Sequence, residues 1–191
     1  VQTCALPISI ADELMHYMVS EQGCYLASKE EQDALTEVVL KGGKLNRKCV
    51  GRDAKTLLGM IGVQVPDNIR CITFEGPKEH PLIATELMMP ILGVVRAKDF
   101  DDAVEQAVWL EHGNRHSAHI HSKNVDNITK YAKAIDTAIL VKNGPSYSAL
   151  GFGGEGFCTF TIASRTGEGL TSASTFTKRR RCVMTDSLCI R

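Results

Sequence analysis

The chain has 191 residues, of which 43% are hydrophobic and 23% are charged, and its 22 basic and 22 acidic residues balance to a formal net charge of zero. Such values are ordinary for a globular domain long enough to bury a core. A neutral chain gives no general electrostatic case for binding nucleic acid, and no apolar run reaches the length of a membrane span.

Seven cysteines are scattered along the chain, an odd number that contains no Cys-x-x-Cys pair. This pattern favours free thiols in a reducing compartment over a disulfide framework or a zinc site. Because no signal peptide opens the sequence, we expect a soluble, cytoplasmic protein. The basic run from Lys178 to Arg181 is interpreted as a solvated or subunit-facing strand rather than a nucleic-acid patch.

The first eight residues, Val1 to Ile8, read as translated sequencing-adapter DNA joined in frame to a coding fragment, and they contain no initiator methionine. We expect residues 1–8 to be a leader foreign to the domain, so Cys4 is not taken as a candidate nucleophile. The alternative is a genuine N-terminal strand.

The first predicted helix begins at Ser9, which serves as its cap, and its apolar residues share one face. The residues of that face are Ile10, Leu14, Tyr17 and Met18.

Two more helices follow. Ser28 and Glu31 form a capping-box pattern for the second helix, which should bury Leu35 and Val39 and end at Gly42-Gly43. Asp53 is expected to cap the third.

Strands and helices alternate with short loops from about residue 70 to 142. The predicted strands are 71–74, 91–95, 117–121 and 137–141, and the predicted helix caps are Asp99 and Asn124. This alternation predicts right-handed βαβ units, a parallel sheet and therefore an α/β fold. Beyond Asn143 glycine and proline become dense, and the β-rich runs 159–163 and 174–184 predict antiparallel or edge strands.

The run from Gly151 to Gly156 satisfies the G-x-G-x-x-G expression for dinucleotide binding. That motif requires a strand directly before it and a helix directly after it, so that the helix N-terminus faces a pyrophosphate. Here a long loop precedes the glycines and a β-rich run follows them. We therefore interpret the glycines as letting a loop approach another backbone or a ligand.

Four histidines crowd into ten residues, and they raise the question of a metal site. They are His112, His116, His119 and His121. His119 and His121 share one face of the predicted strand, but no Asp, Glu or Cys at ligand spacing completes a set. We predict structural or pocket-lining histidines and no metal.

Two segments carry a family resemblance. They are residues 85–92 (TELMMPIL) and 151–156 (GFGGEG), the latter followed by TGEG at 166–169. In this order and at this separation they resemble the C-terminal part of the aldehyde dehydrogenase superfamily. The run 141–146 (VKNGPS) looks specific to the CoA-acylating branch, the propionaldehyde and acetaldehyde dehydrogenases often housed in bacterial microcompartments.

The resemblance implies part of an aldehyde dehydrogenase catalytic domain over residues 9–170. It also implies an oligomerisation strand and tail over 171–191, which would pair with a neighbouring subunit of a homo-oligomer. Such enzymes convert a short-chain aldehyde, NAD and CoA to acyl-CoA and NADH through a cysteine thioester. Because the family's nucleophile lies upstream of Ser9, no catalytic residue is assigned, and the chain alone is expected to be inactive.

Four site residues follow from the resemblance. Glu86 matches the glutamate that hydrogen-bonds the nicotinamide ribose, and Met88 matches the packing position beside it. Phe152 matches a wall of the aldehyde pocket, with plain core packing as the alternative. Asn143, in the VKNGPS run, is placed in the substrate pocket.

Two other functions stay open. One is a fragment of a hydrolytic NAD(P)-dependent aldehyde dehydrogenase, which would not require CoA. The other is a non-catalytic module that pairs subunits through its terminal strand, and such a module should be folded and discretely oligomeric.

Overall fold

The structure is a computed structural model that describes residues 3–156, 158–159, 170–183 and 185. It divides into two compact units. The first contains Val1–Gly113 and Thr129–Ile135, and the second contains Asn114–Ile128 and Asp136–Arg191. Each unit has parallel strands and helices, so the predicted α/β class is confirmed. No helix in the described part of the chain is long and apolar enough to cross a membrane.

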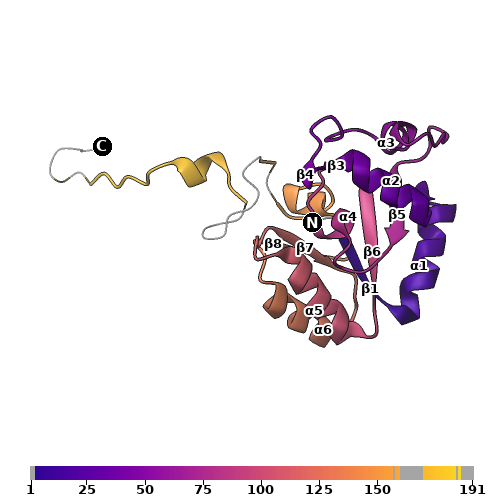
Figure 1. The fold of residues 1–191 in the computed structure, drawn as a ribbon. Coiled ribbons are helices and arrows are strands. Elements are labelled where there is room, and N and C mark those ends of the chain that lie inside the picture. Colours follow the sequence, from indigo (N-terminus) through magenta and orange to yellow (C-terminus); the bar gives the residue numbers. More distant parts are fainter. Residues whose placement is uncertain (1–2, 157, 160–169, 184, 186–191) are drawn as a thin grey trace. The chain divides into compact units, whose positions relative to one another are not determined.

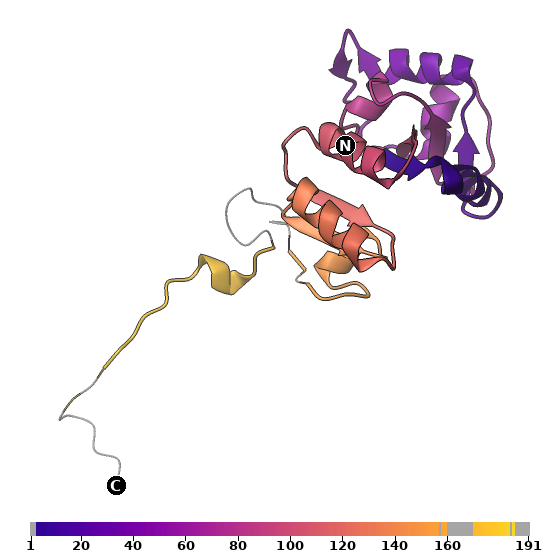
Figure 2. The ribbon, with the colours of Figure 1, turned by 90° about the horizontal axis from the view of Figure 1, so that it is seen from below.

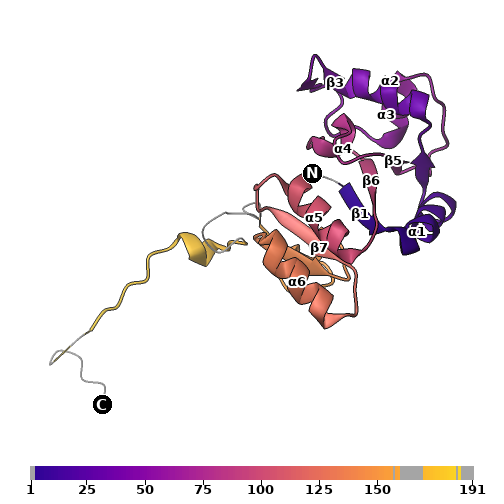
Figure 3. The ribbon, with the colours of Figure 1, turned by 60° about the horizontal axis from the view of Figure 1, so that its bottom comes forward.

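The first unit is built on a four-stranded parallel sheet with the order β1-β6-β5-β2. Its strands are β1 (Thr3–Pro7), β2 (Cys24–Leu26), β5 (Cys71–Glu75) and β6 (Ile91–Ala97). β1 lies beside β6, with Thr3 opposite Gly93 (Figure 3). Most of the segment interpreted as a leader thus forms an edge strand of the sheet, which agrees with the alternative interpretation of an N-terminal strand. That its codons derive from adapter DNA stays a prediction.

Helices cover both faces of this sheet, and α1 lies on a different side of it from α2 and α3 (Figure 1). The helices are α1 (Ile8–Ser20), α2 (Lys29–Val39), α3 (Ala54–Met60), α4 (Pro81–Ala84) and α5 (Phe100–Glu111). Side chains of β6 point alternately to the two faces of the sheet, so the strand contributes to two clusters. Ile91 and Val95 join the large cluster, while Val94 packs with Leu6 and Ala11 on the sheet face that α1 covers.

The prediction for α1 was wrong about its start, because the helix begins at Ile8 rather than after Ser9. The predicted apolar face is largely exposed, with Ile10 at 48% and Tyr17 at 45%. Ala11 is fully buried instead. Ala11 and Met15 are one turn apart, so the helix packs on the sheet through these two residues, adjacent to the apolar stripe that periodicity singled out.

The other early helix caps are confirmed. The Ser28 hydroxyl accepts from the Glu31 amide at 3.3 Å, and the Glu31 carboxylate accepts from the Ser28 amide at 2.7 Å, which is a complete capping box. Asp53 accepts from the Thr56 amide at 2.6 Å and caps α3.

Gly42 and Gly43 do not end α2, which stops at Val39. They form the two-residue turn between β3 (Leu40–Lys41) and β4 (Lys44–Leu45), with φ values of +58° and +74°. Two consecutive left-handed residues are what such a hairpin turn requires, and glycine adopts them without a steric penalty.

In the second unit β7 (Ser117–Ile120) pairs in parallel with β8 (Ile139–Lys142). Asn124 caps α6 (Val125–Ile135) as predicted, because its side-chain oxygen accepts from the amides of Asp126 and Asn127. The last strand begins two residues later than expected, after the left-handed Asp136. A short 3₁₀ helix, η1 (Ser146–Leu150), follows β8.

The β-rich run 174–184, which lies within the expected oligomerisation strand and tail (171–191), forms no strand in the part of it that is described. The described residues from 170 to 183 form no strand. They contain one 3₁₀ turn, η2 (Ala173–Phe176), and are exposed from 173 onward (Figure 2). A strand requires a hydrogen-bonding neighbour, and the neighbour that the resemblance implies is another subunit. The predicted strand 159–163 lies outside the described residues except for Thr159.

Candidate functional site

The segment Thr85–Pro90 joins α4 to β6 and presents the first predicted site residues. Leu87 and Met89, 2% and 5% exposed, enter the large core, while Glu86 and Met88, the residue before each of them, are exposed. Burial of Leu87 and Met89 therefore holds the Glu86 carboxylate outward.

The backbone of this segment is fixed by two hydrogen bonds to neighbouring elements. The Met88 carbonyl accepts from the Gly51 amide at 3.1 Å, and the Pro90 carbonyl accepts from the Ile72 amide of β5 at 2.8 Å. Met88 has a φ of +55°, which is unfavourable for a residue with a side chain and is found disproportionately at functional sites. Its side chain is 65% exposed, so the expected packing contact is not made within this chain.

The end of α4, just before this segment, is held in place by a side chain at the end of α5. His112 ends that helix in a left-handed conformation, and its Nε2 hydrogen-bonds to the Ala84 carbonyl oxygen at 3.0 Å. At the start of α4, the side chain of the buried His80 accepts from the Leu82 amide at 3.2 Å. The sequence pattern did not indicate that this ring caps a helix.

Glu86 makes no hydrogen bond or ion pair with the described residues, although it lies on a fixed segment. An exposed carboxylate without an internal partner is free to accept two O–H donors from one ligand. Its chemistry therefore fits the hydroxyls of a ribose, as the resemblance implied.

Asn143, in the second unit, uses both atoms of its amide within the protein. Its Nδ2 donates to the Ser122 carbonyl at 3.0 Å, and its Oδ1 accepts from the Ser122 amide at 2.8 Å. The residue has a φ of +54°, and its own amide donates to Ile120 at 2.9 Å. Asn143 thus closes the loop after β7, and a contact with substrate stays a prediction.

Phe152 is 63% exposed and is not a core residue of this unit. Its ring meets Tyr147 edge-on, with centroids 6.3 Å apart, and its amide donates to the Tyr147 carbonyl at 3.3 Å. An exposed aromatic ring held at its base can form one wall of an apolar pocket, and that role also stays a prediction.

The glycines around Phe152 allow close backbone approach, as predicted. A Cβ at Gly156 would overlap the Ala149 carbonyl oxygen, and one at Gly154 would lie 2.8 Å from the Ser148 oxygen. Because η1 rather than a strand precedes these glycines, the segment is not a dinucleotide-binding phosphate loop.

The histidine run makes hydrogen bonds within the protein. His119 pairs with the Ser146 hydroxyl of η1, and His116 with the Ser117 hydroxyl at 2.6 Å. Among the described residues no three His, Cys, Asp or Glu side chains gather as a metal site would need.

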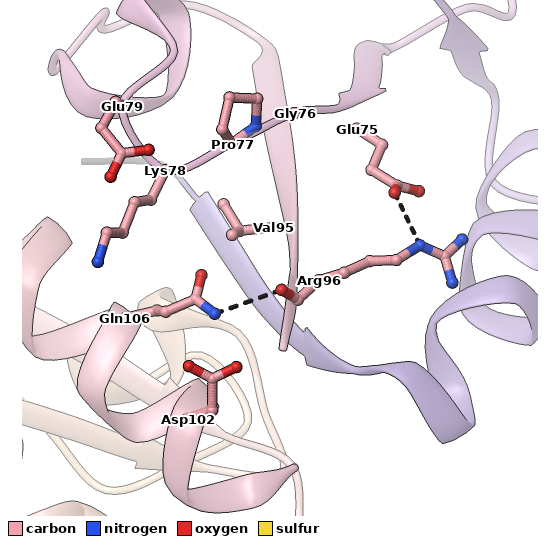
Figure 4. Close-up of a pocket in the computed structure, with 9 residues that line it drawn as sticks. All are labelled: Glu75, Gly76, Pro77, Lys78, Glu79, Val95, Arg96, Asp102 and Gln106. Carbon is pink, nitrogen blue, oxygen red and sulfur yellow. Dashed lines mark hydrogen bonds and ion pairs between the residues drawn. The ribbon is translucent and has the colours of Figure 1, made fainter. Parts of the chain in front are cut away.

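A hollow of about 400 Å³ lies at the opposite, carboxyl edge of the four-stranded sheet (Figure 4). Arg96 lies beside it and bonds Glu75 through Nε at 2.8 Å, and its guanidinium also pairs with Asp12 of α1. Two carboxylates compensate this charge, so the arrangement does not favour an anion. Sequence reasoning missed this hollow, because the ion pairs join residues that are far apart in the chain.

No family model matches the chain. The acetylating acetaldehyde dehydrogenase EutE of Salmonella typhimurium is 46% identical over 185 residues, which cover 94% of this chain and 39% of the relative. A propionaldehyde dehydrogenase from the Clostridium phytofermentans fucose utilisation bacterial microcompartment matches with a TM-score of 0.91 and 77% identity over 100% of this chain and 44% of its own.

A Rhodopseudomonas palustris propionaldehyde dehydrogenase, solved with bound propionyl-CoA, matches with a TM-score of 0.90 and 48% identity over 96% of this chain and 41% of its own. The chain therefore spans about two fifths of the length of the proteins it matches. Its sequence and its fold together place it in the family of CoA-acylating aldehyde dehydrogenases.

Proposed function

We propose that this chain is part of an enzyme that converts a short-chain aldehyde, NAD and CoA to acyl-CoA and NADH. The observation that carries the proposal is the fixed segment Thr85–Pro90, which holds an unpaired carboxylate outward in a chain 46% identical to an acetylating acetaldehyde dehydrogenase. NAD would accept the hydride, and the role of this chain would be to bind and orient NAD.

In this proposal Glu86 accepts hydrogen bonds from both hydroxyls of the nicotinamide ribose. Hydrogen bonds to a charged acceptor contribute about 1.5–3 kcal/mol each, more than bonds between neutral groups. Because burial of Leu87 and Met89 fixes the segment that follows Glu86, the carboxylate is oriented before the ligand arrives, which lowers the entropic cost of binding.

The cysteine nucleophile is proposed to lie upstream of these residues. Cys4 is a poor candidate, because it lies within β1 opposite Val94 and burial raises the pKa of its thiol. A catalytic cysteine requires the opposite shift, since the thiolate is the reactive form. We therefore expect the 191-residue chain alone to produce no NADH from propionaldehyde, NAD and CoA.

A solved relative belongs to a bacterial microcompartment, and on that basis we propose a cytoplasmic enzyme housed in such a compartment. A homo-oligomer is proposed from the resemblance of the C-terminal segment. Requirement for CoA in the longer protein separates this function from a hydrolytic aldehyde dehydrogenase, which would release the free acid.

The test is a set of substitutions in the longer protein. Glu86→Gln should raise the KM for NAD about tenfold or more with little change in the KM for CoA, since one lost charged hydrogen bond corresponds to at least a factor of ten. Glu37→Gln, an exposed carboxylate on α2, is the matched control. Equal KM values for NAD in the two variants would refute the proposed hydrogen bonds between Glu86 and the ribose.

A further inference from the structure

Cys24 and Cys71 lie directly opposite each other on the neighbouring parallel strands β2 and β5. Cys24 is 7% exposed and Cys71 is partly buried. The pair is at the edge of the sheet, because β2 has β5 as its neighbour in the strand order and nothing beyond it among the described strands.

The backbone already brings these two residues to disulfide distance. Neighbouring strands lie about 4.8 Å apart, so paired Cα atoms fall within the window of about 4.4–6.8 Å in which disulfides form. Residues paired across parallel strands point to the same face of the sheet. The two thiols are also close enough for each to influence the pKa of the other.

The other described cysteines lack such a partner. Cys4 pairs in register with Val94, and Cys49 is fully buried with its sulfur 3.7 Å from the Val38 carbonyl oxygen. Cys158 and Cys182 are exposed and belong to no strand. In the described strands, the register therefore sets one cysteine opposite another only at Cys24 and Cys71.

We propose that Cys24 and Cys71 are a redox modification site, which closes as a reversible cross-strand disulfide when the chain meets a two-electron oxidant such as hydrogen peroxide. The Cys24 thiolate attacks one peroxide oxygen, the O–O bond breaks, and the hydroxide released takes up the thiol proton as water. The Cys71 sulfur then attacks the resulting sulfenic sulfur, and the S–S bond forms as the sulfenic oxygen leaves with the Cys71 proton as a second water. Two thiols are oxidised and one peroxide is reduced to two waters.

The electrostatics assign the order of these steps. Burial raises the pKa of both thiols, to about 12 for Cys71, while the neighbouring Cys71 thiol partly offsets the rise at Cys24. Cys24 therefore reaches the thiolate form more readily and reacts first. Oxidation should be slow compared with that of an activated thiol, so the pair behaves as a protected site and not as a catalytic one.

The position of the pair also connects it to the candidate site. Ile72, the residue after Cys71, donates its amide to the Pro90 carbonyl at the end of the segment Thr85–Pro90. A covalent bond at Cys71 would fix β5 one residue from this hydrogen bond. The disulfide proposal itself stands on the register of β2 and β5 and does not depend on the proposed dehydrogenase activity.

The test is to oxidise the full 191-residue chain with a small excess of hydrogen peroxide, block the remaining thiols with N-ethylmaleimide, and map the peptides by mass spectrometry. We expect the Cys24 peptide linked to the Cys71 peptide as the main disulfide product, and its release by dithiothreitol. Cys49→Ser should keep the link, while Cys24→Ser and Cys71→Ser should each abolish it.

A parallel oxidation in 8 M urea separates placement by the fold from random pairing. The share of the Cys24–Cys71 link should fall severalfold there, as all seven cysteines become equivalent. The proposal is overturned if the native and urea samples give the same share, or if native Cys24 is oxidised to the sulfinic acid while Cys71 remains alkylated. Both outcomes are read from the unsubstituted chain, so a variant that fails to fold does not affect the test.

Discussion

The segments 85–90 and 143–156 both carry predicted site residues, but they are held in place by different forces. Leu87 and Met89 fix the first segment by burial in the large core of the first unit. The second is fixed by the Asn143 amide and by glycines that let its backbone close on itself. The first should therefore be sensitive to lost volume, and the second to lost hydrogen bonds and to added Cβ atoms.

The largest effect is expected from Leu87→Ala. Truncation of a leucine that is 2% exposed removes its burial and leaves a cavity, which should cost about 2–5 kcal/mol. Urea unfolding can be followed by fluorescence of Trp109, the single tryptophan, which lies on α5 of the first unit. Met88→Ala, at a 65% exposed side chain, should shift stability by only about 0.5 kcal/mol. Similar urea midpoints for Leu87→Ala and Met88→Ala would contradict the idea that burial holds this segment in place.

Gly156→Ala should be next in size. The added Cβ overlaps the Ala149 carbonyl oxygen, so the loop must open, at a cost of about 1–3 kcal/mol. Hydrogen exchange should show lost protection of the Gly151 and Phe152 amides, which donate to Ser148 and Tyr147. Gly59→Ala is the control, because it adds a Cβ to α3 with nothing within 4 Å and should stabilise the chain by about 0.5–1 kcal/mol. Unchanged protection in Gly156→Ala would contradict close packing of this loop.

Asn143→Ala removes two side-chain hydrogen bonds and should cost about 1–2 kcal/mol. Asn143→Gly also loses both bonds but adopts the positive φ more easily, so it should be less damaging. The amide of Ser122, which donates to the Asn143 side chain, is the specific reporter in hydrogen exchange. If its protection survives in the alanine variant, the amide does not close this loop.

The smallest effect concerns pH. Burial lowers the pKa of His80, and the positive charge of Lys29 lowers it further, against a small opposing effect of Asp33. Because the folded-state pKa lies below the unfolded value of about 6.5, the stabilisation is complete above that pH and declines as pH falls toward the folded value. The unfolding midpoint should drop over this range in the native chain and less in His80→Asn. His16→Asn, at an exposed ring, should behave as the native chain does.

Local features of the fold could be predicted from the sequence, because they depend on a few neighbouring residues. The caps at Ser28, Asp53, Asp99 and Asn124 are of this kind, since each side chain bonds an amide two or three residues ahead. The outward position of Glu86 is nearly local, because it follows from the apolar residues around it.

Features that depend on distant partners could not be predicted in the same way. Periodicity detects the apolar stripe of α1, but it cannot show that the sheet contacts the helix through Ala11. The β-rich composition after Ser174 indicates a capacity to pair, and whether a strand forms depends on a neighbour. The ion pairs of Arg96 join three elements that come together only in the folded unit.

The pairing of β1 with β6 has a consequence for how the chain folds. Thr3 pairs with Gly93, so β1 is synthesised about 90 residues before its neighbouring strand exists. At roughly 5–20 residues per second this delay lasts on the order of 5–20 s. Closing so long a loop also carries an entropic penalty that contacts between adjacent strands avoid. We expect β5 and β6 to associate first, and β1 to join them later.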